Sequence, residues 1–283
     1  MESSQPKALD SSCESSLKLR KIDNAREFEW SKTTDDYSAY RTEYPQSLFD
    51  ILTALGVGLP GQRILDLGTG TGALAMGFAR HGAEVTGLDI SASQISAAKK
   101  LARQQCLQIK FVATAAEDMN FDSSSFEVIT AAQAWIYFDI AVVIPKILGV
   151  LNDDGCLVLT HVQWLPHRDE IARETERLIL KYNPGWTGAG YKGNIRPALN
   201  SVKSDFDLKT FHVMNELIEF TRESWRGRIR ACRAIGASLN PADLAHFDED
   251  HARVLEQIAP EKFGILHQLA VHIFVHKGVV VDV

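Results

Sequence analysis

The chain has 283 residues, 45% of them hydrophobic and 23% charged, and its formal net charge at pH 7 is -6. That length suits one large α/β domain with insertions, and no apolar run is long enough to span a bilayer, so we expect a soluble, cytoplasmic protein with no membrane partner. A nucleic-acid partner is not expected either, because proteins that grip a phosphate backbone carry a basic face.

The cysteines and the first residues add two further exclusions. Cys13, Cys106, Cys156 and Cys232 are far apart and form no C-x-x-C pair, so neither a metal site nor a disulfide framework is expected. Residues 1–26 are rich in serine, lysine and acids with little apolar content, which is typical of a mobile tail without a leader sequence.

Order is expected to begin in residues 27–60. From Pro45 apolar residues recur at helical spacing until glycines and a proline end the helix. Ahead of this helix stands an aromatic group that consists of Phe28, Trp30, Tyr37 and Tyr40. It is expected either to cover a ligand as a lid or to pack on the sheet edge.

Residues 61–166 alternate short apolar runs with helical patterns. The apolar runs are Arg63 to Leu67, Glu84 to Asp89, Ile109 to Ala113, Phe126 to Ala131 and Cys156 to His161. The intervening helices are Gly72 to Arg80, Ala92 to Arg103 and Ile140 to Leu151. Repeated strand-helix units of this kind predict a doubly wound α/β core with a parallel sheet.

The remaining chain reads as insertions around the last strands. Residues 167–204 form a helical and loop insertion, and residues 205–283 hold the last strands with a helical insertion over about 221–263. The expected elements are helices at 168–182, 224–237 and 241–258 and strands near 208–213 and 269–276. We therefore predict a mostly parallel seven-stranded sheet with an antiparallel last strand and a cap of inserted helices.

The first strand of the core ends in a glycine-rich turn. Gly68, Gly70 and Gly72 open the next helix, where a backbone without Cβ atoms can approach a ligand closely. This pattern also satisfies the dinucleotide fingerprint, so a nicotinamide cofactor remains an alternative. Asp66 argues against that alternative, because a carboxylate beside a pyrophosphate would cost roughly 1 to 4 kcal/mol.

A cationic ligand suits this turn better. S-adenosylmethionine carries an ammonium and a sulfonium, and Asp66 can balance one of them. Asp89 closes the second strand, where a carboxylate can accept both ribose hydroxyls. Two acids would then bracket the cofactor.

The sequence resembles the class I, Rossmann-like S-adenosylmethionine-dependent methyltransferases of small-molecule type, from about Phe28 to Gly278. The matching stretches include Phe28-Glu29-Trp30, Tyr37-Ser38-Ala39-Tyr40-Arg41, Tyr44-Pro45, Asp66 to Gly72, Ala116-Glu117-Asp118, Phe126 to Trp135, Phe138-Asp139, His161, Trp164, Asn183-Pro184 and Trp225 to Arg230. Relatives of this kind share the cofactor while their acceptors vary, so the resemblance implies the methyl donor and no particular acceptor.

The resemblance also implies roles for individual residues in binding S-adenosylmethionine and the product S-adenosylhomocysteine. Asp66, Gly68 and Gly70 would face the methionine part and Asp89 the ribose. Ala116 and Glu117 would face the adenine, Ala132 and Gln133 the sulfonium, and Tyr37, Tyr40, Arg41, Thr69, Gly72, Ile90 and Gln94 would complete the site. No metal is implied. Two positions depart from the usual pattern, since Ala115 stands where relatives often have aspartate and Ile136 where they often have histidine.

The acceptor should meet the carboxyl ends of the strands. The residues expected to bind it are Trp135, Tyr137, Trp164, Trp186, Trp225 and Arg226. Core packing of the tryptophans and a solvated arginine face are the plainer alternatives. His161 and Tyr137 are the catalytic candidates, since a histidine with an unperturbed pKa near 6.5 suits proton removal from a hydroxyl.

The sequence therefore predicts an enzyme that methylates an O, N or C atom of a small metabolite, for example one of secondary metabolism. A catalytically silent cofactor-binding module is the main alternative, and an NAD(P)-dependent oxidoreductase the weaker one. The sequence predicts no oligomeric state.

Overall fold

The computed structural model describes residues 22–25, 28–40, 44–193 and 200–277. Most of the expected tail and the predicted cofactor residue Arg41 lie outside these ranges. Within them, none of the helices is both long enough and apolar enough to cross a membrane.

A seven-stranded sheet in the order β3-β2-β1-β4-β5-β7-β6 forms the centre of the molecule. The strands are β1 (Arg63–Leu67), β2 (Glu84–Asp89), β3 (Ile109–Ala113), β4 (Phe126–Ala132), β5 (Leu151–Trp164), β6 (Phe206–Thr221) and β7 (Lys262–His276). Strands β3, β2, β1, β4 and β5 pair in parallel, whereas β7 runs antiparallel to both β5 and β6. The predicted doubly wound sheet with an antiparallel last strand is thus confirmed.

Helices cover both faces of this sheet, as the crossover rule for parallel strands requires. The helices are α2 (Thr34–Tyr40), α3 (Gln46–Ala54), α4 (Ala73–Arg80), α5 (Ala92–Gln104), α6 (Ile140–Val150), α7 (Glu170–Tyr182), α9 (Arg222–Arg230) and α10 (Pro241–Ile258). Short 3-10 turns are η1 (Ile22–Ala25), η2 (Trp30–Thr33), η3 (Ala116–Asp118) and η4 (Trp135–Tyr137). One core cluster joins α3, α4 and α5 to the sheet, and a second packs α6 on the opposite face.

Polar residues at the helix starts explain where several of these helices begin. Ser91, Asp139 and Asp169 each accept a hydrogen bond from the first turn of the helix that follows, with donor-acceptor distances between 2.9 and 3.4 Å. Thr221 and Ser224 form a reciprocal capping box at the start of α9. Such caps satisfy backbone N–H groups that have no partner inside the helix.

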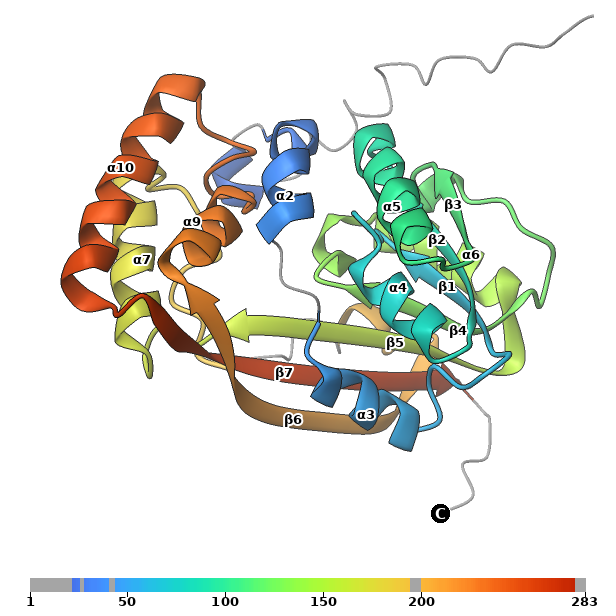
Figure 1. Ribbon diagram of the computed structural model, residues 1–283. Coiled ribbons are helices and arrows are strands. Elements are labelled where there is room, and N and C mark those ends of the chain that lie inside the picture. Colours follow the sequence, from blue (N-terminus) through green and yellow to red (C-terminus); the bar gives the residue numbers. More distant parts are fainter. Residues whose placement is uncertain (1–21, 26–27, 41–43, 194–199, 278–283) are drawn as a thin grey trace, which may run out of the picture.

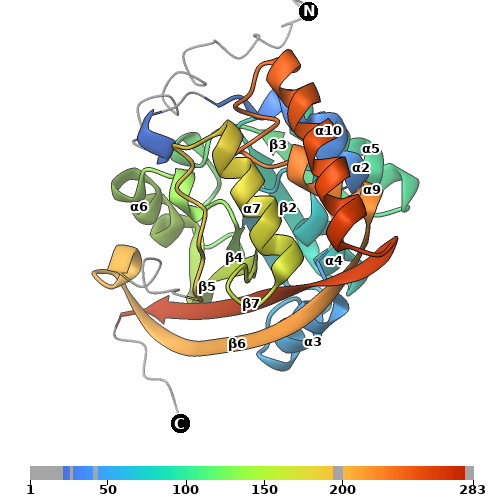
Figure 2. The same ribbon diagram turned by 90° about the vertical axis from the view of Figure 1, so that its left-hand side faces the viewer.

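The strands β5, β6 and β7 are much longer than the rest and extend past the carboxyl end of β4. Ala132, the last residue of β4, pairs with Thr160, so β5 continues for four residues beyond it. Helices α7, α9 and α10 stand on this extension at the left of Figure 1 and in front in Figure 2. They enclose a third core cluster of their own, so the inserted helices form a cap beside the carboxyl edge of the sheet.

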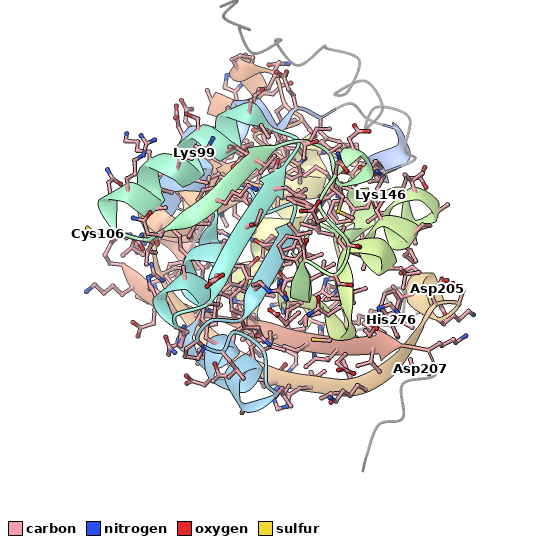
Figure 3. All side chains as sticks on the ribbon, turned by 90° about the vertical axis from the view of Figure 1, so that its right-hand side faces the viewer. Lys99, Cys106, Lys146, Asp205, Asp207 and His276 are labelled. Atoms are coloured by element: carbon pink, nitrogen blue, oxygen red, sulfur yellow. The ribbon has the colours of Figure 1, made fainter. Side chains whose placement is uncertain are left out.

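The opposite end of the long strands lies away from the cap. Asp205, Asp207 and His276 mark it in Figure 3, on the face of the molecule that α5 and α6 also border. Phe206 pairs there with His276 across β6 and β7. The cofactor candidates, which follow the carboxyl ends of β1 to β4, are therefore on the side of the sheet that the cap overhangs.

The lengths predicted from the sequence are too short for the long strands and too long for one helix. Polar residues alternate with apolar ones along β6, because one side of this edge strand is exposed, and only its segment 208–213 was predicted. The helix predicted over 224–237 ends at Arg230, and the chain then turns so tightly that a Cβ on Gly236 would lie 2.0 Å from the Arg230 carbonyl oxygen.

Candidate active site

Asp66 is the buried acid of the site. It lies near the end of β1 and is 2% exposed, and its Oδ1 accepts a hydrogen bond from Thr130 Oγ1 at 2.7 Å. Burial and, to a smaller extent, the nearby Asp89 raise its pKa to about 6, against the opposing effect of hydrogen bonds from two threonines. A cation placed beside this buried carboxylate would stabilise its charged form.

The turn after Asp66 has the backbone shape that only glycine adopts easily. Gly68, Gly70 and Gly72 have φ angles of +67°, +57° and +84°. A Cβ on Gly68 would lie 2.5 Å from the Ala134 Cβ, so this position also has no room for a larger residue. Without Cβ atoms, the backbone of this turn at the start of α4 can approach a ligand closely.

Asp89 links this turn to the next strand. Its Oδ2 accepts a hydrogen bond from the Gly70 amide and its Oδ1 one from the Ser91 amide, both at 2.9 Å. Burial raises its pKa, although the two amides favour the charged form. Beside it, Gln94 is 3% exposed and its Oε1 has no hydrogen-bond partner among the described residues. This buried acceptor is expected to receive a donor from a ligand.

The end of β4 holds a residue in an unfavourable backbone conformation. Gln133 has a φ of +60°, which is uncommon for a residue with a side chain. Its Nε2 donates to the Val162 carbonyl oxygen of β5, and its backbone N–H donates to Thr160 at 3.2 Å. These two bonds tie Gln133, one of the two residues that the resemblance placed beside the sulfonium, to β5.

Helix α2 lies between the glycine turn and the cap (Figure 1). A Cβ on Gly70 would lie 3.3 Å from the Tyr37 hydroxyl, so the Tyr37 ring covers the turn. The Tyr40 ring lies against Gly227 of α9, and its hydroxyl donates to Glu223 at 2.8 Å. Such an arrangement favours the lid interpretation of this segment over packing on the sheet edge.

Tyr137 belongs to an aromatic cluster that the sequence did not reveal. Its ring packs against Phe28 and Trp30 with centroid distances of 5.9 and 5.6 Å, and its hydroxyl accepts a hydrogen bond from Arg233 at 2.8 Å. Arg233 also forms a buried ion pair with Asp23 at 2.6 Å. Asp23 and Arg233 were missed because neither lies in a motif, and they meet across 210 residues of chain.

The second catalytic candidate, His161, is a weaker base than predicted. Burial and, to a smaller extent, the neighbouring His272 lower its pKa to about 4. The two rings lie edge to face at 6.2 Å. The expectation of an ordinary histidine pKa near 6.5 is therefore wrong, because a strand position flanked by apolar neighbours disfavours the charged ring.

The four predicted acceptor-binding tryptophans are buried side chains. Trp135 donates to Ser201 at 2.8 Å and belongs to the core cluster around α6. Trp164, Trp186 and Trp225 belong to the core of the cap, and Trp225 is fully buried. Most of the surface of these four side chains is therefore taken up by core packing, which was the plainer alternative to acceptor binding.

Arg226 is occupied by acidic neighbours in the cap. It pairs with Asp248 of α10 and, at 3.5 Å, with Glu223 one turn away on α9. Its predicted role in acceptor binding loses support, because carboxylates of the protein already neutralise the guanidinium.

The remaining predicted cofactor residues follow the carboxyl ends of the strands. Thr69 donates its amide to the Leu88 carbonyl at 2.9 Å, which ties the glycine turn to β2. Glu117 of η3 accepts a hydrogen bond from the Asp139 amide at 2.7 Å. The other four positions, which border the same edge of the sheet, are Ile90, Gly72, Ala116 and Ala132.

Comparison with known proteins identifies this part of the chain. Residues 64–155 match the family model of a methyltransferase domain. In sequence, this segment of the chain is therefore similar to a methyltransferase domain. The matched segment covers β1 to β4 and the start of β5, and thus most of the residues that surround the glycine turn.

Curated relatives match more distantly. A ubiquinone biosynthesis O-methyltransferase of Coxiella burnetii is 40% identical over 77 residues, which are 27% of this chain and 33% of that protein. The corresponding protein of Xanthomonas campestris pv. campestris is 28% identical over 180 residues, covering 62% of this chain and 73% of its own. The chain thus spans about a third of the length of the first relatives it matches.

A solved structure shares the fold at low sequence identity. Phosphoethanolamine N-methyltransferase 2 of Haemonchus contortus, in complex with phosphomonomethylethanolamine and S-adenosylhomocysteine, superposes with a TM-score of 0.52. It is 16% identical and the match covers 87% of this chain and 57% of that one. This similarity supports the fold, while the acceptor must be argued from the chain itself.

Proposed function

We propose that this protein transfers the methyl group of S-adenosylmethionine to an O, N or C atom of a small-molecule acceptor. The observation that carries the proposal is the buried Asp66 beside three glycines with positive φ. A buried carboxylate whose pKa is raised toward neutrality by loss of water is stabilised by a cationic partner. The methionine ammonium is such a partner, whereas a pyrophosphate would repel it.

The residues present fit this cofactor in three respects. Asp89 stands at the end of β2, where it would accept the ribose hydroxyls in exchange for, or beside, its two amide donors. The unpartnered Gln94 Oε1 offers an acceptor next to it. Gln133, held in a strained conformation, would face the sulfonium, and Tyr37 would cover the bound molecule from α2.

When bound, S-adenosylmethionine supplies a methyl group on a positively charged sulfur that leaves as a neutral thioether. The acceptor would offer a lone pair in line with the carbon-sulfur bond of the cofactor. The main task of the protein is then to hold the acceptor in line with that bond and to keep water out. The cap and α2, which border the site on the side away from the sheet, are suited to both tasks.

Proton removal from the acceptor is not assigned to a strong base. His161 is neutral at pH 7 and can accept a proton, but a pKa of about 4 makes it a weak acceptor. Tyr137, whose hydroxyl is held by the Arg233 guanidinium, would orient an acceptor rather than deprotonate it. Acceptors whose methylated atom is already nucleophilic fit this site best.

The experiment is methyl transfer from radiolabelled S-adenosylmethionine into fractionated small-molecule extracts. We expect label in at least one fraction with the wild type and none with Asp66→Ala, while Asp122→Asn, a change of an exposed acid, behaves as the wild type. Cofactor binding without any labelled product would favour a silent binding module. Binding of NADH and not of S-adenosylmethionine would refute the proposal.

A further inference from the structure

The arginines of α9 differ in their partners. Arg226 and Arg230 point to one side of the helix, where Asp248, Asp36 and Glu223 neutralise them at distances up to 3.8 Å. Arg228, two residues from each, lies on nearly the opposite side, since alternate helix positions are about 200° apart. It forms no ion pair with a carboxylate of the described residues.

The guanidinium of Arg228 is held in place without being neutralised. It lies over the Trp164 ring with its Cζ 5.5 Å from the ring centroid. Its Nη1 donates to the Cys232 Sγ at 3.0 Å, which is a weak acceptor. A guanidinium has five N–H donors, and a half-buried cation with so few partners loses hydration without compensation.

Two routes of contact connect Arg228 to the cofactor residues. The Tyr40 ring of α2 packs against Gly227, the residue before Arg228. Also on α2, the Tyr37 ring covers Gly70. On the other route Trp164, under the guanidinium, is two residues beyond Val162, whose carbonyl accepts from Gln133. Arg228 therefore lies in the cap and stacks on a residue of β5 that is two positions from the carbonyl bound by Gln133.

We propose that Arg228 anchors an anionic group, a carboxylate or a phosphate, of the methyl acceptor. This inference rests on the proposed function, because only methyl transfer makes the bound anion an acceptor. The planar fork of N–H donors matches two oxygens of either group, and the Trp164 ring beneath fixes the plane of the fork. The site would thus select acidic small molecules, although the protein as a whole is acidic.

The anion is assigned to the acceptor and not to the methionine carboxylate of the cofactor, because the cofactor residues Asp66, Gly70 and Asp89 all lie on the sheet side of α2. Arg228 belongs to the cap helix α9, and the neighbouring Gly227 of that helix packs against Tyr40 of α2. The two assignments predict different effects of one variant, and the experiment below separates them.

The test is a titration with benzoate and, separately, with inorganic phosphate, at constant ionic strength, followed by calorimetry and tryptophan emission. It is performed on protein with and without bound S-adenosylhomocysteine. The variants are Arg228→Gln and Arg228→Lys, with Arg253→Gln as the matched control, because Arg253 is an exposed cap arginine that pairs with acids on its own helix.

We expect saturable binding of at least one anion to the wild type, about tenfold weaker or more in Arg228→Gln and unchanged in Arg253→Gln. Preference for benzoate or for phosphate identifies the class of anion, and Arg228→Lys should retain phosphate better than benzoate. The melting temperature of Arg228→Gln should equal or exceed that of the wild type, because an uncompensated cation is removed.

Three outcomes would overturn the proposal: no saturable anion binding by the wild type, equal binding by Arg228→Gln, or a loss of S-adenosylhomocysteine affinity of about tenfold in that variant. The last would assign Arg228 to the cofactor. A wild type that binds no S-adenosylhomocysteine would refute the proposed function instead, and the titration of the free protein would still decide whether Arg228 binds an anion.

Discussion

Cofactor affinity should depend on pH through Asp66. Its pKa is raised to about 6 in the folded protein, so the carboxyl is mostly ionised at pH 7 and mostly protonated at pH 5. If the cationic cofactor binds only the ionised form, its dissociation constant should rise about tenfold between pH 7 and pH 5. Asp66→Asn should bind about 10 to 150 times more weakly at pH 8, the range for losing a hydrogen bond to a charged group.

Calorimetric titration of S-adenosylhomocysteine from pH 5 to pH 8 measures both effects. Circular dichroism at each pH confirms that the protein stays folded, and Asp122→Asn serves as the control for a general loss of negative charge. The residual affinity of Asp66→Asn should vary much less with pH than that of the wild type. An equal pH profile in the two proteins, or a flat profile in the wild type, would refute the role given to Asp66.

Three further predictions concern stability and the position of α2. Gly227→Ala places a Cβ 2.1 Å from the Tyr40 Cγ, so it should displace α2 and weaken S-adenosylhomocysteine binding without abolishing folding, as calorimetry and melting curves would show. Asp23→Asn leaves the buried Arg233 without its carboxylate and should lower the free energy of unfolding by about 3 kcal/mol or more in urea titrations. Burial lowers the pKa of His251 to about 3 in the folded protein. As the pH falls, the unfolded protein therefore takes up a proton at this residue before the folded protein does. Stability should therefore fall as pH drops below about 6.5, by up to about 1.4 kcal/mol per pH unit from this group, and less steeply in His251→Gln.

The part of the fold that follows from local pattern was predictable. Strands β1 to β4 are short, apolar and bounded by turns, so each can be recognised in the sequence as a short apolar run. Most of strand β6 was not, because its side chains alternate between a half-buried and an exposed face and several of the exposed ones are apolar. The length of β6 is determined by its pairing with the whole of β7 and not by hydrophobicity.

The candidate site divides in the same way. The glycines and the two acids around β1 and β2 lie within 24 residues, and their spacing alone brings them together. The groups that distinguish the cap side do not share a motif. Arg228 differs from Arg226 and Arg230 only in what surrounds it, since acids from α2 and α10 reach one side of α9 and not the other. Such differences become visible only when distant segments are packed.

Burial also changed the chemistry expected of single side chains. His161 and the tryptophans were predicted from residue type, which suggests a base and aromatic pocket walls. In the folded protein, the surroundings lower the pKa of His161 and take the rings of Trp164 and Trp225 into the core of the cap. Residue type indicates what a side chain can do, and its environment decides which of those properties it keeps.

The central claim is that S-adenosylmethionine binds between the glycine turn and α2. A crystal structure of the protein with S-adenosylhomocysteine tests it most directly. We expect the methionine part beside Asp66 and Gly70, the ribose at Asp89 and the Tyr37 ring over the bound molecule. Density for the ligand at any other position, with this turn empty, would contradict the claim.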